Sequence, residues 1–259
     1  MASKTLPVIV VTGASRGLGK AVCHKLASQG ANIVGVARSE KLLSELKDEI
    51  EKINPECTFV PCAGDLSDGE IAKRIVNTAV EKFGRIDGLV NNAGALEPVK
   101  KIANCSVEEW KRHFDINVFA VMDLTKEALP YLRKSRGRTV NISSGASTRV
   151  YQAWGAYCTS KAALNMFSAC LAAEEQQIVS VAIRPGVVKT EMQTTVYNEG
   201  AKNMDPSEYQ KFQKLHDESG LLPPEIPGSV IANLVLNAGR ELSGRFLSFD
   251  DPELASFRD

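Results

Sequence analysis

VIVVTGASRGLG, residues 8–19, is an apolar run that leads into a glycine-rich turn, and helix-like spacing follows from about residue 17 to residue 28. Gly13, Gly17 and Gly19 permit a tight turn, let the backbone approach a pyrophosphate, and allow a helix to pack closely on a strand. The helix that begins there presents free N–H groups and its positive dipole end to phosphates. A glycine cluster alone also fits an ordinary tight turn, but the strand–turn–helix order favours a dinucleotide-binding site.

The rest of the chain repeats the alternation of strand and helix. Apolar runs occur at 33–36, 57–60, 89–90, 138–142 and 179–183, and helical patterns at 40–53, 68–83, 107–132 and 156–174. The runs are nearly continuously apolar, as expected for a parallel sheet that is covered on both faces. Regular alternation predicts right-handed crossovers and a doubly wound sheet. We therefore predict an α/β fold: a single Rossmann-like domain over residues 1–259, with helices on both faces of a parallel sheet.

Residues 190–224 interrupt this rhythm. The segment is polar, has helical spacing over 206–218, and ends in Leu221-Leu222-Pro223-Pro224. An insertion of this kind is either a surface excursion or a lid over a site. Because it directly follows the C-terminal end of a predicted strand, where open α/β sheets bind ligands, we predict a substrate lid.

The composition argues against several classes of protein. Lysine plus arginine and aspartate plus glutamate each total 31, so no net charge favours nucleic acid or an anionic membrane. The six cysteines form no CxxC pair, and the N-terminal apolar run is too short for a signal peptide or a spanning helix. We therefore predict a cytoplasmic protein. His24, His113 and His216 have no ligand-like spacing, so no metal site is predicted.

The end of the second predicted strand, Val36-Ala37-Arg38-Ser39, bears on the choice of cofactor. An acidic residue at this place bonds the ribose 2′-hydroxyl of NAD. This chain has Arg38 there, and Arg16 in the glycine loop would complete a basic pocket for a 2′-phosphate. Two exposed surface arginines are the alternative. Glu40, the nearest acid, falls at the start of the following helix, so the pattern favours NADPH.

Tyr157 and Lys161 stand four residues apart and so share one face of a predicted helix. A nearby ammonium stabilises a phenolate, and we expect Lys161 to lower the pKa of Tyr157 from about 10 toward working pH. The phenol can then exchange a proton with a carbonyl oxygen. A YxxxK pair alone occurs by chance in many helices. Ser144, at the end of the predicted fifth strand, can reach the same edge of the sheet and makes a catalytic site the better interpretation.

Over essentially its whole length the chain resembles the short-chain dehydrogenase/reductase family. The motifs that carry the resemblance stand in the family's order and spacing. They are the TGxxxGxG loop Thr12–Gly19, Asp65-Leu66, Asn91-Asn92-Ala93-Gly94, Asn117, Ser144, Tyr157, Lys161 and Pro185-Gly186-Val187-Val188-Lys189-Thr190.

The resemblance implies a catalytic role for four of these residues. Ser144 would hydrogen-bond the substrate carbonyl and Tyr157 would protonate it. Lys161 would bind the nicotinamide ribose while tuning Tyr157. Asn117 would hold a water that relays protons through Lys161.

The resemblance also implies the cofactor site. Asp65 and Leu66 would bind the adenine edge, Thr190 would contact the nicotinamide carboxamide, and Asn91 with the Gly94 turn would support the central sheet and the cofactor ribose. The predicted cofactor-binding residues are Gly13, Ser15, Arg16, Gly17, Leu18, Gly19, Arg38, Asp65, Leu66, Asn92, Ala93, Gly94, Tyr157, Lys161, Pro185, Gly186, Val188 and Thr190.

Within the family, four stretches are most similar to fungal benzil reductases and sepiapterin-reductase-like carbonyl reductases. They are residues 96–99, 143–147, 154–157 and 247–252. Asn91 departs from that branch, where alanine often stands, and the difference concerns support of the turn. In this family the helix from Ala156 and the long helix before it commonly form a subunit interface, which implies a homodimer.

Tyr151, Trp154 and Met192 are the predicted walls of the substrate pocket, together with Ser144 and Tyr157; simple packing is the alternative for the first three. We expect this pocket to be apolar, partly aromatic and free of a fixed charge that could hold a carboxylate.

These observations predict an NADPH-dependent carbonyl reductase that transfers hydride to a ketone, a 1,2-diketone or an aldehyde, with Tyr157 as the proton donor. An NAD-dependent alcohol dehydrogenase is one alternative, and Arg38 argues against it. A catalytically idle nucleotide-binding regulator is the other, and the intact catalytic set argues against it.

Overall fold

Parallel strands form one sheet in the order β3-β2-β1-β4-β5-β6-β7 in the computed structural model, which describes residues 6–217 and 220–258. The strands are β1 Val8–Thr12, β2 Asn32–Ala37, β3 Phe59–Ala63, β4 Gly88–Asn91, β5 Arg138–Ile142, β6 Val179–Arg184 and β7 Phe246–Ser248. Each pair of neighbours is parallel. The strand order reverses between β1 and β4, and the carboxyl ends of strands at such a reversal leave a crevice for ligands.

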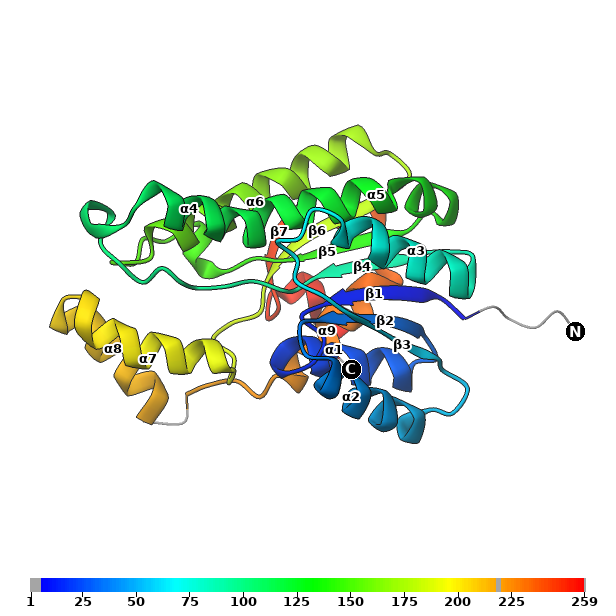
Figure 1. Ribbon diagram of the computed structural model, residues 1–259, viewed down its shortest axis with the longest axis horizontal. Coiled ribbons are helices and arrows are strands. Elements are labelled where there is room, and N and C mark those ends of the chain that lie inside the picture. The colour runs from blue at the N-terminus through cyan, green and yellow to red at the C-terminus, as the bar shows by residue number, and fades with distance from the viewer. Residues whose placement is uncertain (1–5, 218–219, 259) are drawn as a thin grey trace, which may run out of the picture.

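Helices cover both faces of the sheet (Figure 1). One layer holds α1 Gly17–Ser28, α2 Glu40–Ile53 and α9 Glu225–Asn237, and the other holds α3 Ile71–Phe83, α4 Val107–Phe114, α5 Ala120–Ser135 and α6 Gly155–Glu174. The doubly wound, Rossmann-like fold predicted from the sequence is thereby confirmed. No helix in the described part of the chain is both long and apolar enough to cross a membrane.

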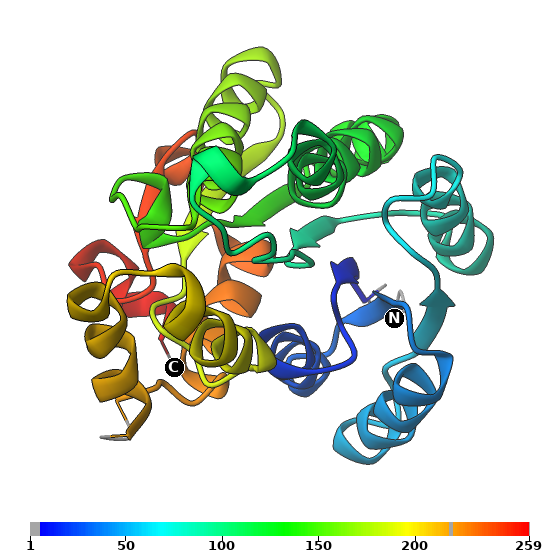
Figure 2. The same ribbon diagram turned by 60° about the vertical axis from the view of Figure 1, so that its left-hand side comes forward.

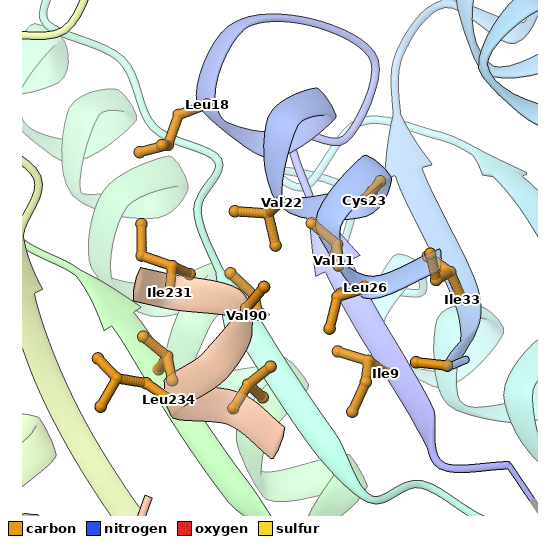
Figure 3. Packing of buried hydrophobic residues seen from close by; sticks show 14 of the residues in the cluster. Ile9, Val11, Leu18, Val22, Cys23, Leu26, Ile33, Val90, Ile231 and Leu234 are labelled. Carbon is orange, nitrogen blue, oxygen red and sulfur yellow. The ribbon is translucent and has the colours of Figure 1, made fainter. Parts of the chain in front are cut away.

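The two faces of β1 explain why its sequence is apolar without alternation. Ile9 and Val11 face the layer of α1 and α9, where Leu26 and Ile231 belong to the same buried cluster (Figure 3). Val10 belongs to a second buried cluster, on the side of α3 and α5. A strand that is covered on both sides therefore needs apolar residues at successive positions.

Two elements near the C-terminus, α9 and β7, were not predicted. The sequence of α9 places Pro227 and Gly228 near its start, which indicates a turn when read without the fold. Proline is tolerated in the first turn of a helix, because those N–H groups have no intrahelical partner. Gly228 serves the packing of α9 on α1, since a Cβ at this position would lie 3.0 Å from Cβ of Ala21.

Predicted boundaries were wrong in three places, one of them the third helix, which begins at Ile71 rather than at residue 68. The third strand is Phe59–Ala63 rather than 57–60, and it includes Pro61 at the edge of the sheet, where a missing N–H is tolerated. The long helix predicted over 107–132 is interrupted by a π-helical turn, Asp115–Phe119, between α4 and α5. Such turns are frequent at functional sites, and this one carries Asn117.

The segment predicted as a lid forms two helices, α7 Glu191–Asn203 and α8 Pro206–Asp217, which project from the carboxyl edge of the sheet (Figures 1 and 2). The helical spacing over 206–218 predicted α8, apart from Glu218, which lies outside the described residues. Asp205 between the helices bonds Gln152, since Nε2 of Gln152 donates to Oδ2 of Asp205 over 2.8 Å. It also pairs with Lys101 at 3.0 Å. These contacts attach the helical pair to the loops beside the sheet.

Candidate active site

A cavity of about 1070 Å³ opens at the carboxyl edge of the sheet, where the strand order reverses. Its walls include Gly13 after β1, Asn92 after β4, Ser144 after β5 and Pro185 after β6. Nearly all the residues that sequence patterns assigned to the site line this one cavity. The exceptions are Gly19 among the predicted cofactor-binding residues and Asn117 among the predicted catalytic ones.

The glycine loop offers the cavity an open helix N-terminus. Gly17, the first residue of α1, has φ of +52° and Gly13 has φ of +65°, a region that residues with a Cβ rarely adopt. No side chain caps α1 and no acidic residue occupies its first turn. The free N–H groups and the positive helix end therefore suit the phosphates of a dinucleotide.

Gly19 lies behind this loop and does not line the cavity, and its contact with the cofactor stays a prediction. A Cβ on Gly19 would collide with the carbonyl oxygen of Gly13 and with the Asn92 side chain. Its role is close packing of α1 beneath the loop. The absence of a side chain at Gly19 therefore lets α1 lie close to the loop that forms the phosphate site.

A network of hydrogen bonds around Thr12 joins the ends of β1 and β4. Oγ1 of Thr12 accepts from the backbone N–H groups of Asn92 and Ala93, both over 3.0 Å. Nδ2 of Asn92 donates back to the carbonyl oxygens of Thr12 over 2.9 Å and of Gly13 over 3.2 Å. Asn91, just before, is buried and donates to Oδ1 of Asn141 on β5 over 2.8 Å. The central strands thus reach the cavity in fixed register.

The end of the cavity beside Arg38 and Asp65, where the adenosine of a dinucleotide is expected, contains a contact that sequence reasoning missed. Arg38 is exposed at the end of β2, as the strand pattern predicted. Arg16, however, forms an ion pair with Glu191 at the start of α7 instead of standing free beside Arg38. Asp65 accepts hydrogen bonds from the backbone N–H and hydroxyl of Ser67, and these bonds hold the pKa of its carboxyl below the ordinary range, with a smaller contribution from Arg38.

The chemical centre is formed by α6 and the end of β5. Tyr157 and Lys161 are both buried on α6. Nζ of Lys161 donates to the carbonyl oxygen of Ile142 over 2.7 Å and lies 5.6 Å from the centroid of the Tyr157 ring. Ser144 accepts from the N–H of Ala146 over 3.1 Å, which leaves its own hydrogen free to bond the phenol. One carbonyl oxygen can therefore meet both hydroxyl groups.

Burial controls the protonation of this centre. It raises the pKa of Tyr157 to about 12, against a hydrogen bond from Ser144 that lowers it. Burial also lowers the pKa of Lys161 to about 8. The expectation that Lys161 brings the pKa of Tyr157 toward working pH is therefore wrong for the chain by itself, because burial raises this pKa by more than the hydrogen bond from Ser144 lowers it. Tyr157 is a neutral phenol at pH 7.

Asn117 is fully buried in the π-helical turn and reaches the cavity only through a neighbour. Its Oδ1 accepts from the N–H of Ala95 and its Nδ2 donates to the carbonyl oxygen of Ala95, both over 2.8 Å. A Cβ on Gly94 would lie 3.1 Å from that Oδ1 and 3.6 Å from Nζ of Lys161. The amide group therefore holds the turn that lines the cavity.

The substrate end of the cavity is aromatic, as predicted, but it is not free of charge. The rings of Tyr151 and Trp154 lie 5.0 Å apart, and Phe212 of α8 lies 5.0 Å from Trp154. Met192 also lines the cavity. Arg149 and Arg184 line it too, which corrects the expectation of a pocket without fixed charge.

Sequence reasoning missed Phe212, Arg149 and Arg184. Phe212 is an aromatic residue within the helical spacing that predicted the lid, and this was the available signal. Arg184 directly precedes Pro185-Gly186, and strand alternation puts its side chain on the α6 side of β6, whereas Ile183 faces α1 and α9.

A parallel doubly wound sheet, an uncapped glycine loop and a Ser–Tyr–Lys group whose tyrosine and lysine are buried together define a dinucleotide-binding oxidoreductase. The sequence model of the family described as short chain dehydrogenase matches residues 7–200, and the chain belongs to this family.

Known proteins resemble the chain along most of its length. A short-chain dehydrogenase/reductase of Saccharomyces cerevisiae with a solved structure is 40% identical, with a TM-score of 0.93 over 98% of this chain and 100% of that one. A benzil reductase ((S)-benzoin forming) of the same organism is 38% identical over 259 residues, which cover 95% of this chain and 97% of the relative. Sepiapterin reductase of Mus musculus is 35% identical over 228 residues, 83% and 86% of the two chains. The resemblance stated from the motifs is confirmed.

The lowered pKa of Lys161 makes a testable statement about stability. Between pH 8 and the ordinary lysine pKa of about 10.4, the unfolded chain binds more protons at this site than the folded one, so the free energy of unfolding rises with pH. We expect the wild type minus Lys161→Met difference in that free energy to rise by up to about 1.4 kcal/mol per pH unit in this window. Urea unfolding at several pH values measures it. A difference that stays flat would contradict the burial of an ionisable lysine.

Proposed function

We propose that this chain is an NADPH-dependent carbonyl reductase that converts ketones, 1,2-diketones or aldehydes to alcohols, with Tyr157 as the proton donor. The observation that carries the proposal is the joint position of Ser144, Tyr157 and Lys161 on one cavity that also reaches Arg38. Oxidoreductase activity follows from the family; the direction, cofactor and substrate are the proposal.

Each residue has a distinct task in the proposed reaction. The nicotinamide cofactor, when bound, supplies the hydride to the carbonyl carbon. Ser144 donates a hydrogen bond to the carbonyl oxygen and so orients it toward Tyr157. Tyr157 transfers its proton to that oxygen as negative charge develops there, which completes the alcohol. Lys161 stabilises the phenolate that remains.

The similarity to a benzil reductase favours reduction over the alternative of an alcohol dehydrogenase, since the same residues serve a reduction and its reverse. A pKa raised to about 12 keeps the phenol of Tyr157 protonated at neutral pH, the state from which reduction starts. Oxidation of an alcohol would start from the phenolate. The other alternative, a catalytically idle nucleotide-binding regulator, does not explain why Ser144 lies within hydrogen-bond reach of the Tyr157 phenol.

Replacing Tyr157 with phenylalanine tests the assignment of the donor. Tyr157→Phe should lower kcat about 10²–10⁴-fold, the usual contribution of a positioned acid, and leave the Kd for NADPH within about threefold. Tyr131→Phe, a half-buried tyrosine of the second core cluster, is the matched control and should remain fully active. If Tyr157→Phe kept more than half of the wild-type kcat with a good substrate, the proposed donor would be wrong.

The preference for NADPH rests mainly on Arg38. It follows Ala37, where an aspartate would repel a 2′-phosphate, and it is exposed and adjacent to the cavity. A charge-assisted hydrogen bond to phosphate contributes about 1.5 kcal/mol net at an open site, roughly tenfold in affinity. Arg16 contributes only when it leaves Glu191, so that ion pair competes with the phosphate.

Cofactor preference is measurable with the wild type and two variants. Wild type should prefer NADPH over NADH by at least about tenfold in kcat/KM, and Ala37→Asp with Arg38→Leu should reverse the order. Glu191→Gln releases Arg16 and should increase the preference for NADPH. Added salt should weaken NADPH binding more than NADH binding, because only NADPH uses the extra charge. Equal use of both cofactors by wild type at low salt would refute this part of the proposal.

Bulky aryl carbonyl compounds fit the substrate end better than small keto acids. Tyr151, Trp154 and Phe212 form an aromatic wall that would gain by burying phenyl rings. Arg184 is half-buried and lies near the catalytic loop, with Nη1 4.0 Å from the place of a Cβ on Gly145. Its guanidinium suits a second carbonyl oxygen beside the reacting one, as a 1,2-diketone offers.

A matched pair of substrates tests this role. Benzil and deoxybenzoin differ only in that a CH₂ group replaces one carbonyl group. We expect kcat/KM for benzil to exceed that for pyruvate by at least about tenfold, since only benzil covers the aromatic wall. Arg184→Leu should lower kcat/KM for benzil by about tenfold and leave that for deoxybenzoin within about twofold. A preference for pyruvate, or equal losses with both ketones, would reject the substrate assignment.

A further inference from the structure

His113 occupies an unusual place for a helical residue of the outer layer. It is 1% exposed and is the buried residue of α4, one helical turn before Asn117. Its ring lies edge-on to the Tyr157 ring, with centroids 6.2 Å apart and planes at 74°. The catalytic tyrosine and Asn117 therefore both border an imidazole to which the proposed reaction gives no role.

The hydrogen bonds of His113 determine its tautomer. Nδ1 lies 2.7 Å from the carbonyl oxygen of Glu97, which can only accept, so Nδ1 carries the hydrogen. Nε2 lies 2.8 Å from Nδ2 of Asn117. That amide has its orientation fixed by Ala95, whose N–H needs Oδ1 and whose carbonyl oxygen needs Nδ2. Nε2 must therefore accept, and the ring is neutral.

Through these bonds His113 joins three parts of the active site. It holds Glu97 directly and Ala95 through Asn117, and so anchors both ends of the loop 95–97 after β4. Gly94, Ala95 and Leu96 in this region line the cavity. On the other side, Oγ of Ser160 lies 3.0 Å from Nε2 and 2.9 Å from the carbonyl oxygen of Tyr157, and its one hydrogen can be donated to either acceptor.

We propose that His113 is a positioning residue: as a neutral acceptor it fixes the Asn117 amide and thereby the cavity-lining loop after β4 against the helix of Tyr157 and Lys161. The proposal rests on the proposed carbonyl reduction at this site. A merely packed histidine would need only its shape. Here each ring nitrogen has a hydrogen-bond partner, and Asn117 is fully buried, so an apolar replacement would leave one N–H of its amide without this acceptor.

Protonation of His113 would break this arrangement. A protonated Nε2 would point a hydrogen at the N–H donor of Asn117. The groups that face the ring are Lys161 and Tyr157 on α6 and Glu97 on the loop. Burial keeps the pKa of His113 below its ordinary value, and the charge of Lys161 acts in the same direction against the bond to Glu97. The site should therefore lose order only in acid.

Two variants separate hydrogen bonding from packing. His113→Phe keeps a ring but no acceptor, and should lower kcat/KM about 10–100-fold with a raised KM for NADPH, since small displacements of a site cost this much. His113→Gln keeps an acceptor that does not titrate, and should stay within about threefold of wild type. Its kcat/KM should also lack the fall that we expect for wild type in acid, below the ordinary pKa of histidine. His24→Gln, at a half-exposed histidine paired with Glu49, is the control and should retain the wild-type pH profile.

The tautomer provides a readout that does not depend on activity. ¹⁵N NMR of the whole protein at pH 7 should show His113 protonated at Nδ1 and not at Nε2, which also decides the matter if His113→Phe does not fold. An Nε2–H tautomer, a folded His113→Phe within twofold of wild type, or the same acid limb in His113→Gln would overturn the proposal. Retained activity in Tyr157→Phe would instead reject the reaction and leave the tautomer intact.

Discussion

The hydroxyl of Thr12 holds together the two strands on which the site depends. At the reversal of strand order, β1 and β4 each end in a turn, and the turns diverge to leave room for a ligand. The hydrogen bonds among Thr12, Gly13 and Asn92 cross this gap, so the glycine loop and the turn after β4 keep a fixed separation. The positions of the phosphate cradle and of the Gly94 wall both follow from this link.

A second constraint is the low polarity of the space around α6. Burial raises the pKa of Tyr157 and lowers the pKa of Lys161. In both cases it favours the uncharged form of the side chain. A pKa of about 8 still leaves the amine mostly protonated at pH 7, and the carbonyl oxygen of Ile142 accepts its hydrogen bond over 2.7 Å. In the proposed reaction, proton donation would create a phenolate close to this cation, in a medium where their attraction is strong.

The sequence predicted the features that follow from local pattern. The glycine loop, α1, the parallel sheet and the Ser144–Tyr157–Lys161 group needed only spacing and strand order. What it missed depends on contacts between distant segments: Gly228 is explained only by Ala21, and Arg16 is diverted by Glu191. The prediction of a lowered pKa for Tyr157 was wrong for the same reason, because the spacing of Tyr157 and Lys161 does not show that both are buried. The homodimer and the cytoplasmic location stay predictions.

The ion pair of Arg16 with Glu191 links the glycine loop to α7, in the segment predicted as a lid. Glu191 is the first residue of α7, and Phe212 of α8 lies against Trp154, so the helical pair contacts the cavity at both of its ends. A phosphate that binds Arg16 beside Arg38 would break the ion pair of Arg16 with Glu191. Exposed ion pairs contribute little to stability, about 0–1 kcal/mol, so this exchange costs little. Under the proposed function, the same guanidinium would therefore pair with Glu191 in the free protein and with a phosphate of the cofactor in the complex.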